Sequence, residues 1–139
     1  MIIPESLLLS QVEARSLSYL LQNHKLIHEL KPQGYFFNKA FAEIYYALYT
    51  LNDVTLSNEL LQSRLKVEYH PQLQELKPLA DYTEENFNSD ISLLKENGYL
   101  IKLWQANEDI NLKIPSLDRE SAFDSIREWR QMLDRLEKH

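Results

Sequence analysis

The sequence predicts an all-α protein, a helical bundle followed by a C-terminal helical hairpin. The 139 residues include only 2 Gly and 5 Pro, so tight turns are few and long helices are favoured. Apolar side chains recur at intervals of three and four residues over most of the chain, as they do on the buried faces of helices. Hydrophobic residues make up 44% and charged residues 26%, a balance that excludes wholesale disorder.

The first helix is predicted to start at a capping box, residues 10–13. In this motif the Ser10 hydroxyl and the Glu13 carboxylate satisfy each other's backbone donors. Asn23 is expected to end this helix and to cap a short second one, which Pro32 and Gly34 end. The residues expected on the buried faces of these two helices are Val12, Leu17, Leu20, Leu21, Leu26, Ile27 and Leu30.

Three further helices are predicted before residue 80. Asn38 is expected to cap the third helix and Thr55 the fourth, while Pro71 suits the first turn of a fifth that Pro78 closes. Their expected inward residues are Phe41, Ile44, Tyr45 and Leu48, then Leu56, Leu60 and Leu61, then Leu73 and Leu76.

Two helices are predicted between residues 83 and 113. The acidic run 83–85 suits a helix start, and Asn97–Gly98 suits the C-cap of that helix. A separate helix is then expected from Tyr99 to about Lys113, where Pro115 breaks it. Their apolar faces are Phe87, Ile91 and Leu94, and Tyr99, Leu103, Ala106 and Ile110.

Asp118 is expected to cap a last helix whose apolar residues follow a 4, 3, 4, 3 spacing, the pattern of a coiled-coil seam. The seam residues are Ala122, Ile126, Trp129, Leu133 and Leu136. Two helices joined across Pro115 would form an antiparallel hairpin. We therefore expect a bundle over residues 1–97 and a hairpin over residues 98–139.

The net charge of −6 argues against a domain that grips phosphate backbones, so we expect a protein partner and no direct binding of nucleic acid. The chain has no Cys, which fits a reducing cytoplasm. No segment approaches the roughly 20 apolar residues of a membrane span, so no membrane association is expected.

Motifs for catalysis, cofactors or metals are missing from the sequence. There is no Gly-rich phosphate loop and no nucleophile elbow. His24 and His28 are spaced i, i+4 but have no third ligand nearby, and the acidic run from Asp81 to Asp90 lacks EF-hand spacing. We expect no metal and no cofactor.

An aromatic group between residues 35 and 49 could stack on bases of a single strand, but its helical spacing and its lack of basic neighbours other than Lys39 favour core packing.

The last helix carries the clearest candidate for a partner-binding surface. Trp, Met and Arg are enriched at the centres of protein interfaces, and this helix holds all three types around its seam. The same seam also suits the inner face of the hairpin, so both interpretations stay open. The candidate residues are Phe123, Arg127, Trp129, Arg130, Met132, Leu133, Arg135 and Leu136.

From Gln11 onward the chain resembles the C-terminal helicase-binding domain of bacterial DnaG-type primases. The likeness is carried by the order and spacing of four features: residues 13–15 leading into Leu17, Leu20 and Leu21; Phe36–Phe37 ahead of residues 41–45; residues 83–85 with Phe87, Ile91 and Leu94; and a long helix with a terminal hairpin.

This resemblance implies a non-catalytic interaction domain whose parent is a DNA primase, a DNA-directed RNA polymerase. The hairpin would dock on the N-terminal domain of the hexameric replicative helicase, and the bundle would modulate helicase activity. The isolated chain is expected to be monomeric.

The N-terminal domain of a DnaB-type helicase has the same fold and is the alternative. That domain usually has Gly soon after the Leu run of its first helix and a Gly-Gly pair before its sixth. Here Leu21 is followed by Gln22, and no Gly lies between Gly34 and Gly98, whereas residues 53–56 resemble the helicase pattern.

Overall fold

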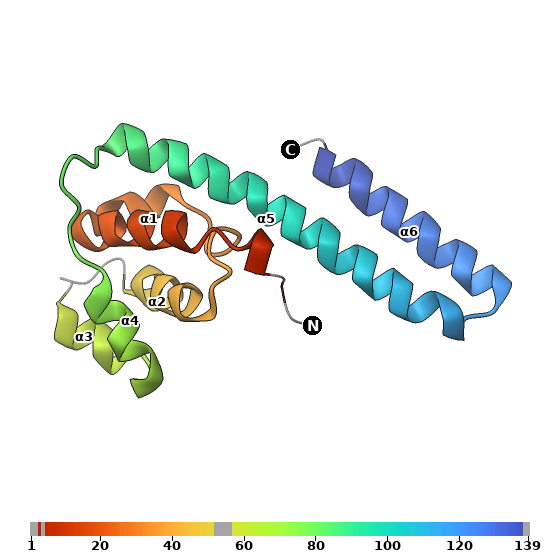
Figure 1. The fold of residues 1–139 in the computed structure, drawn as a ribbon, viewed down its shortest axis with the longest axis horizontal. Helices are drawn as coiled ribbons and strands as arrows, with labels where there is room; N and C mark the ends of the chain where they lie inside the picture. The colour runs from red at the N-terminus through yellow and green to blue at the C-terminus, as the bar shows by residue number, and fades with distance from the viewer. Residues whose placement is uncertain (1–2, 4, 52–56, 138–139) are drawn as a thin grey trace. The chain divides into compact units, whose positions relative to one another are not determined.

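A computed structural model describes residues 3, 5–51 and 57–137, without the side chains of Glu5, Leu136 and Glu137. Every regular element in these ranges is a helix, which confirms the all-α class (Figure 1). The elements in order are η1 (Glu5–Leu7), α1 (Ser10–Gln22), η2 (His24–Glu29), α2 (Lys39–Thr50), α3 (Asn58–Ser63), η3 (Val67–Tyr69), α4 (His70–Glu75), α5 (Glu84–Lys113), η4 (Ile114–Ser116) and α6 (Arg119–Glu137).

The chain divides into two compact units. One is Leu8–Gly98, and the other joins Tyr99–His139 with Met1–Leu7. The first unit contains a continuous hydrophobic core to which α1, η2, α2, α3, α4 and α5 all contribute. Its fully buried members include Leu17, Leu20, Ile27, Ile44, Leu48, Leu61 and Leu94.

α1 starts at Ser10 as predicted, but the prediction of a capping box is wrong. Leu9 occupies the N-cap position, and no side chain caps the helix. Glu13 points into the core instead, where it is 1% exposed and its Oε1 accepts hydrogen bonds from the backbone N–H groups of Phe37 (2.9 Å) and Asn38 (3.1 Å). Glu13 shares the i, i+4, i+7 face of Leu17 and Leu20, so burial of that face carries the carboxylate inward.

Asn23 ends α1, as predicted, because its backbone N–H bonds to carbonyls of the last turn. Its predicted role as a side-chain cap for the next helix is wrong. The Asn23 side chain donates back to the Tyr19 carbonyl (3.1 Å), and the following element, η2, is a 3₁₀ helix. η2 therefore begins without a side-chain cap, and it is short, as 3₁₀ helices usually are.

α2 has the predicted cap. The Asn38 side-chain oxygen accepts hydrogen bonds from the N–H groups of Ala40 (3.2 Å) and Phe41 (3.5 Å). Ile44, Tyr45 and Leu48 are buried on the predicted face, and Phe41 is partly buried against the same core. Most of the aromatic group therefore packs inside, although Tyr46 is 61% exposed.

Two short helices follow. α3 is capped by Ser57, whose hydroxyl accepts from the Leu60 N–H (3.1 Å), so the cap is not Thr55. Thr55 and Leu56 lie outside the described residues. α4 has Pro71 in its first turn as predicted, with Leu73 buried.

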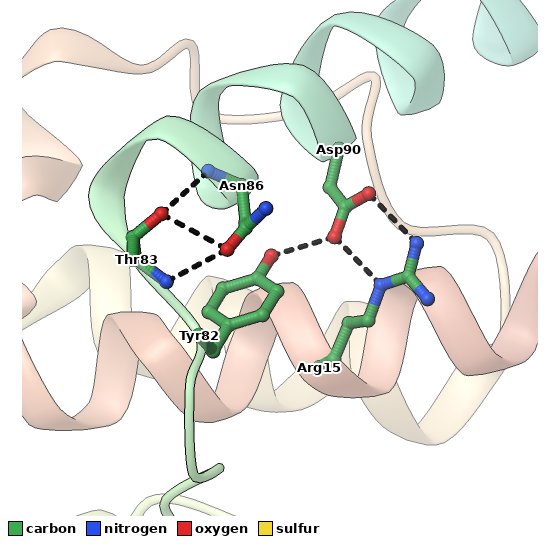
Figure 2. Close-up of polar contacts among 5 residues, drawn as sticks. All are labelled: Arg15, Tyr82, Thr83, Asn86 and Asp90. Atoms are coloured by element: carbon green, nitrogen blue, oxygen red, sulfur yellow. Dashed lines mark hydrogen bonds and ion pairs between the residues drawn. The ribbon is translucent and has the colours of Figure 1, made fainter.

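α5 begins where the acidic run predicted it, with a reciprocal cap. The Asn86 N–H donates to the Thr83 hydroxyl (3.2 Å), and the Thr83 N–H donates to the Asn86 side-chain oxygen (3.0 Å), as Figure 2 shows. The predicted end at Asn97–Gly98 is wrong, because α5 runs without interruption to Lys113. The helix expected to start at Tyr99 is therefore the second half of α5.

Gly98 is placed in mid-helix for a packing reason. A Cβ at this position would lie 2.5 Å from the Gly34 carbonyl oxygen and 3.3 Å from Phe37 Cε2. Glycine is needed at this position because the segment before α2 packs directly against the backbone of α5. It does not serve to end the helix or to turn the chain.

A polar cluster joins α1 to α5 at the edge of this core (Figure 2). The Arg15 guanidinium donates twice to the Asp90 carboxylate, through Nε (2.7 Å) and Nη2 (2.8 Å). The Tyr82 hydroxyl donates to the same carboxylate (2.6 Å). The guanidinium holds the pKa of Asp90 below its ordinary value, and burial raises the pKa of Tyr82 to about 12.

None of the helices in the described part of the chain combines the length and apolar content that crossing a bilayer requires.

Candidate partner-binding surface

The hairpin unit is built by a short reversal after α5. Pro115 lies in η4, and Leu117 adopts an extended backbone that ends the turn. Asp118 then caps α6 as predicted, because its carboxylate accepts from the Ser121 N–H (2.7 Å), which also lowers the pKa of Asp118. α6 runs back alongside the second half of α5 (Figure 1).

The hairpin has almost no buried interior. Ile101 is fully buried, but from residue 102 to residue 135 every described side chain is at least partly exposed. Two helices cannot enclose a core by themselves, so their facing apolar residues stay half-covered. This partial exposure distinguishes the hairpin from the 8–98 unit, where many side chains are fully enclosed.

A shallow groove of about 280 Å³ lies between the two helices of the hairpin. α5 lines it with Ala106, Asp109, Ile110 and Lys113, and α6 lines it with Ser125, Glu128, Trp129, Met132 and Arg135. Apolar side chains from both helices are thus combined with charged side chains of both signs. Asp109 and Lys113 pair with each other across one turn of α5 (3.3 Å).

Trp129 lies in this groove with an unsatisfied donor. Its indole Nε1 is buried and has no hydrogen-bond acceptor among the described residues. The rest of the side chain is only partly buried. An indole N–H normally finds an acceptor when it is buried, so this donor is an exception within the described part of the chain.

The predicted partner-binding residues fall on two sides of α6. Trp129, Met132 and Leu133 are half-buried, and the first two line the groove together with Arg135. Phe123 lies about 120° around the helix from Trp129, because six residues at about 100° each separate them. The structure therefore does not bring all of the predicted residues into one patch.

The second side of α6 is exposed and carries charges of both signs. Phe123 is 54% exposed, with the Arg119 guanidinium 5.7 Å from its ring centre. Arg127 is exposed and pairs with Asp124 (3.4 Å), and Arg130 is exposed as well. The side chain of Leu136 lies outside the described residues.

Sequence reasoning missed several groove residues. Ser125 and Glu128 were not singled out, although Ser125 lies at i, i+4, i+7 with Trp129 and Met132. The same spacing is also the signal that could have found two buried carboxylates of the bundle. Glu13 lies on the Leu17 face of α1, and Asp90 lies between Phe87 and Leu94 on α5.

The candidate metal ligands do not gather. Within the described ranges, no three His, Asp or Glu side chains lie close enough together to hold an ion. Asp90 is bound to Arg15 and Tyr82, while Asp81, Glu84 and Glu85 are exposed at the start of α5.

The chain was compared with protein-family models, with curated proteins and with solved structures. It matches none of them. The arrangement on the hairpin, a half-covered apolar groove edged by charged side chains, is suited to association with another molecule.

Proposed function

We propose that this chain is the helicase-binding module of a bacterial DnaG-type primase. It would dock on the N-terminal domain of the hexameric replicative helicase in the cytoplasm, recruit primase to the replication fork and modulate helicase activity. The module itself would be non-catalytic, and the polymerase activity would belong to other domains of the parent primase.

One observation carries this proposal: the hairpin leaves its apolar residues half-covered. From residue 102 to residue 135 no described side chain is fully enclosed, and Trp129 and Met132 line the groove while only partly buried. Burial of Trp129, Met132 and Leu133 against partner helices would remove this apolar surface from water, at about 25 cal/mol per Å². The charged rim of the groove, Asp109, Lys113, Glu128 and Arg135, would supply selectivity.

Titration calorimetry against the purified N-terminal domain of a DnaB-type helicase tests the proposal. We expect Trp129→Ala to weaken binding by a few kcal/mol, the scale of an interface hot spot, and Leu136→Ala to weaken it as well. The matched control is Tyr46→Ala, which removes an exposed aromatic side chain from α2 in the other unit and should leave affinity unchanged. Equal affinity of all variants would remove the hairpin as the docking surface.

Deletion after Pro115 provides a second test. The truncated chain keeps the whole core of the 8–98 unit, so its helical circular dichroism should survive while helicase binding is lost. Binding that persists without α6 would contradict the proposal.

The alternative function is the N-terminal domain of a DnaB-type helicase, which self-associates and binds primase. Sedimentation of the isolated chain separates the two functions. A monomer supports the primase module, whereas a dimer or ring supports the helicase domain.

A further inference from the structure

Glu13 is a buried acid that holds another segment of the chain. Glu13 is 1% exposed, and its Oε1 accepts hydrogen bonds from the N–H groups of Phe37 (2.9 Å) and Asn38 (3.1 Å). Asn38 is the N-cap residue of α2. A single side chain of α1 therefore anchors the backbone at the point where α2 begins.

The anchored segment is also held from a second side. The Gly34 carbonyl and the Phe37 ring rest against Gly98 of α5, so closely that a Cβ at Gly98 would lie 2.5 Å from the Gly34 oxygen. Residues 34–38 thus lie between the Glu13 carboxylate of α1 and the backbone of α5. A change in the bonding of Glu13 acts directly on this segment.

The surroundings of Glu13 favour its neutral form. Burial raises the pKa of Glu13 to about 7, and the two amides of Phe37 and Asn38 offset part of that rise. No charged side chain is among the causes of this pKa shift. Removal of a carboxylate from water without a cation to pair with costs free energy, and protonation relieves that cost.

Most charged and titratable groups on the neighbouring elements are exposed or bonded to other residues. On α1 itself, Arg15 is paired with Asp90 of α5. The exposed charged or titratable side chains on elements packed against α1 are Lys25, His28 and Glu29 of η2, Lys31 of the following segment, and Lys39 and Glu43 of α2. His24 of η2 is half-buried, and Tyr45 of α2 donates its hydroxyl to the Lys31 carbonyl.

We propose that Glu13 is a protonation-controlled latch on residues 34–38. The neutral carboxyl keeps this segment closed against α1 and α5, and the ionised carboxylate favours an open state in which the carboxylate reaches water. This inference concerns the bundle alone and does not depend on the helicase-binding proposal.

The direction of the effect follows from linkage. In the open state the carboxyl has an ordinary glutamate pKa near 4.3, so it loses its proton more easily there than in the closed state. A higher pH therefore favours opening. With a closed-state pKa of about 7, the opening constant should rise about tenfold between pH 6 and pH 8 and level off above that.

Amide hydrogen exchange of the intact chain, followed by NMR and corrected for intrinsic exchange rates, tests the latch. In the wild-type protein the opening constants of the Phe37 and Asn38 amides should rise about tenfold from pH 6 to pH 8. Amides in the middle of α2, which exchange through larger openings, should have smaller opening constants than these two amides at each pH. In Glu13→Gln, whose amide oxygen can still accept the two bonds, the rise should disappear, while the control Glu43→Gln, an exposed change on α2, should retain it.

Two results would overturn the latch. One is a pH-dependent rise that persists in Glu13→Gln, and the other is an opening constant for the Phe37 and Asn38 amides that equals the opening constant of amides throughout the bundle, because exchange would then require global unfolding. A measurement on the wild-type protein alone keeps the test valid if the variant does not fold: the Glu13 side-chain ¹³C resonance should titrate with the same midpoint as the opening, and an ordinary carboxylate midpoint near 4.3 would contradict the proposal.

Discussion

Arg15 and Asp90 form a bidentate pair across 75 residues of sequence. Nε lies 2.7 Å from Oδ2, and Nη2 lies 2.8 Å from Oδ1. Asp90 is nearly buried, whereas 43% of the Arg15 side chain is exposed. The pair connects α1 to α5, and the Tyr82 hydroxyl donates to the same Asp90 carboxylate.

Replacement of Asp90 by Asn should destabilise the fold by about 1–2 kcal/mol, because a charge-assisted bidentate bond becomes a neutral one while Arg15 stays partly hydrated. Tyr82→Phe should cost about 1 kcal/mol. Urea denaturation at pH 7 measures the loss of stability in both variants, with the exposed Glu85→Gln on α5 as the control.

The contribution of the Arg15–Asp90 pair to stability should depend on pH. Since Arg15 lowers the pKa of Asp90, this contribution should be complete at neutral pH and should be lost as the pH falls through the lowered pKa of Asp90.

Glu13→Gln should stabilise the protein at pH 8 and change it little at pH 5. The buried carboxyl has a pKa of about 7, raised by desolvation, so ionisation costs stability as the pH rises from about 4.5 to 7 and the neutral amide avoids that cost. The gain at pH 8 should be roughly 2–3 kcal/mol. Thermal melts at pH 5 and pH 8 measure this gain. An equal change in melting temperature at both pH values would show that Glu13 does not titrate in this range.

Gly98→Ala should destabilise the bundle, although alanine is the better helix former by about 1 kcal/mol. The added methyl group would meet the Gly34 carbonyl oxygen at 2.5 Å, and a backbone atom cannot swing aside as a flexible side-chain end can. Chemical denaturation should show a net loss of stability. Glu96→Ala, an exposed change on the same helix, should stay within about 0.5 kcal/mol of the wild type.

Asn38→Ala should cost about 1 kcal/mol, the usual value of a lost N-cap. The Asn38 side chain satisfies the Ala40 and Phe41 amides at the start of α2, and alanine cannot. The exposed neighbour Lys39→Ala provides the control. If both variants unfold at the same denaturant concentration, the cap does not contribute.

Variants on the two sides of α6 should differ in their effect on the fold. Phe123 is 54% exposed and contacts Arg119, so Phe123→Ala should leave the melting temperature nearly unchanged while it weakens helicase binding. Trp129 lines the groove between α5 and α6, so Trp129→Ala should lower both affinity and hairpin helicity. Circular dichroism and calorimetry on the same samples would show whether the two effects separate.

Local sequence rules predicted most helix positions. Asn38 capped α2, Pro71 opened α4, Asp118 capped α6, and the reversal at Pro115 ended α5 as expected. Each of these features depends on a few neighbouring residues and on backbone hydrogen bonds within one turn. Such features are readable without any knowledge of the fold.

Two of the features that sequence reasoning misread, Glu13 and Gly98, involve partners far along the chain. Glu13 fits a capping box locally, but it lies on the buried face of α1 and accepts hydrogen bonds from the Phe37 and Asn38 amides, more than twenty residues away. Gly98 fits a C-cap locally, and it lies in mid-helix because Gly34 approaches it. In such cases a local sequence pattern is compatible with two structures, and tertiary packing determines which of them forms.

The sequence by itself therefore determined the helical class, the helix starts with strong caps and the presence of an amphipathic last helix. Only the tertiary structure decided that α5 is continuous, that two carboxylates are buried and that the candidate residues of α6 divide between a groove and an exposed, charged side. The physical reason is that helix propensity and capping act within a turn, whereas burial and close backbone approach are set by residues brought together from distant parts of the chain.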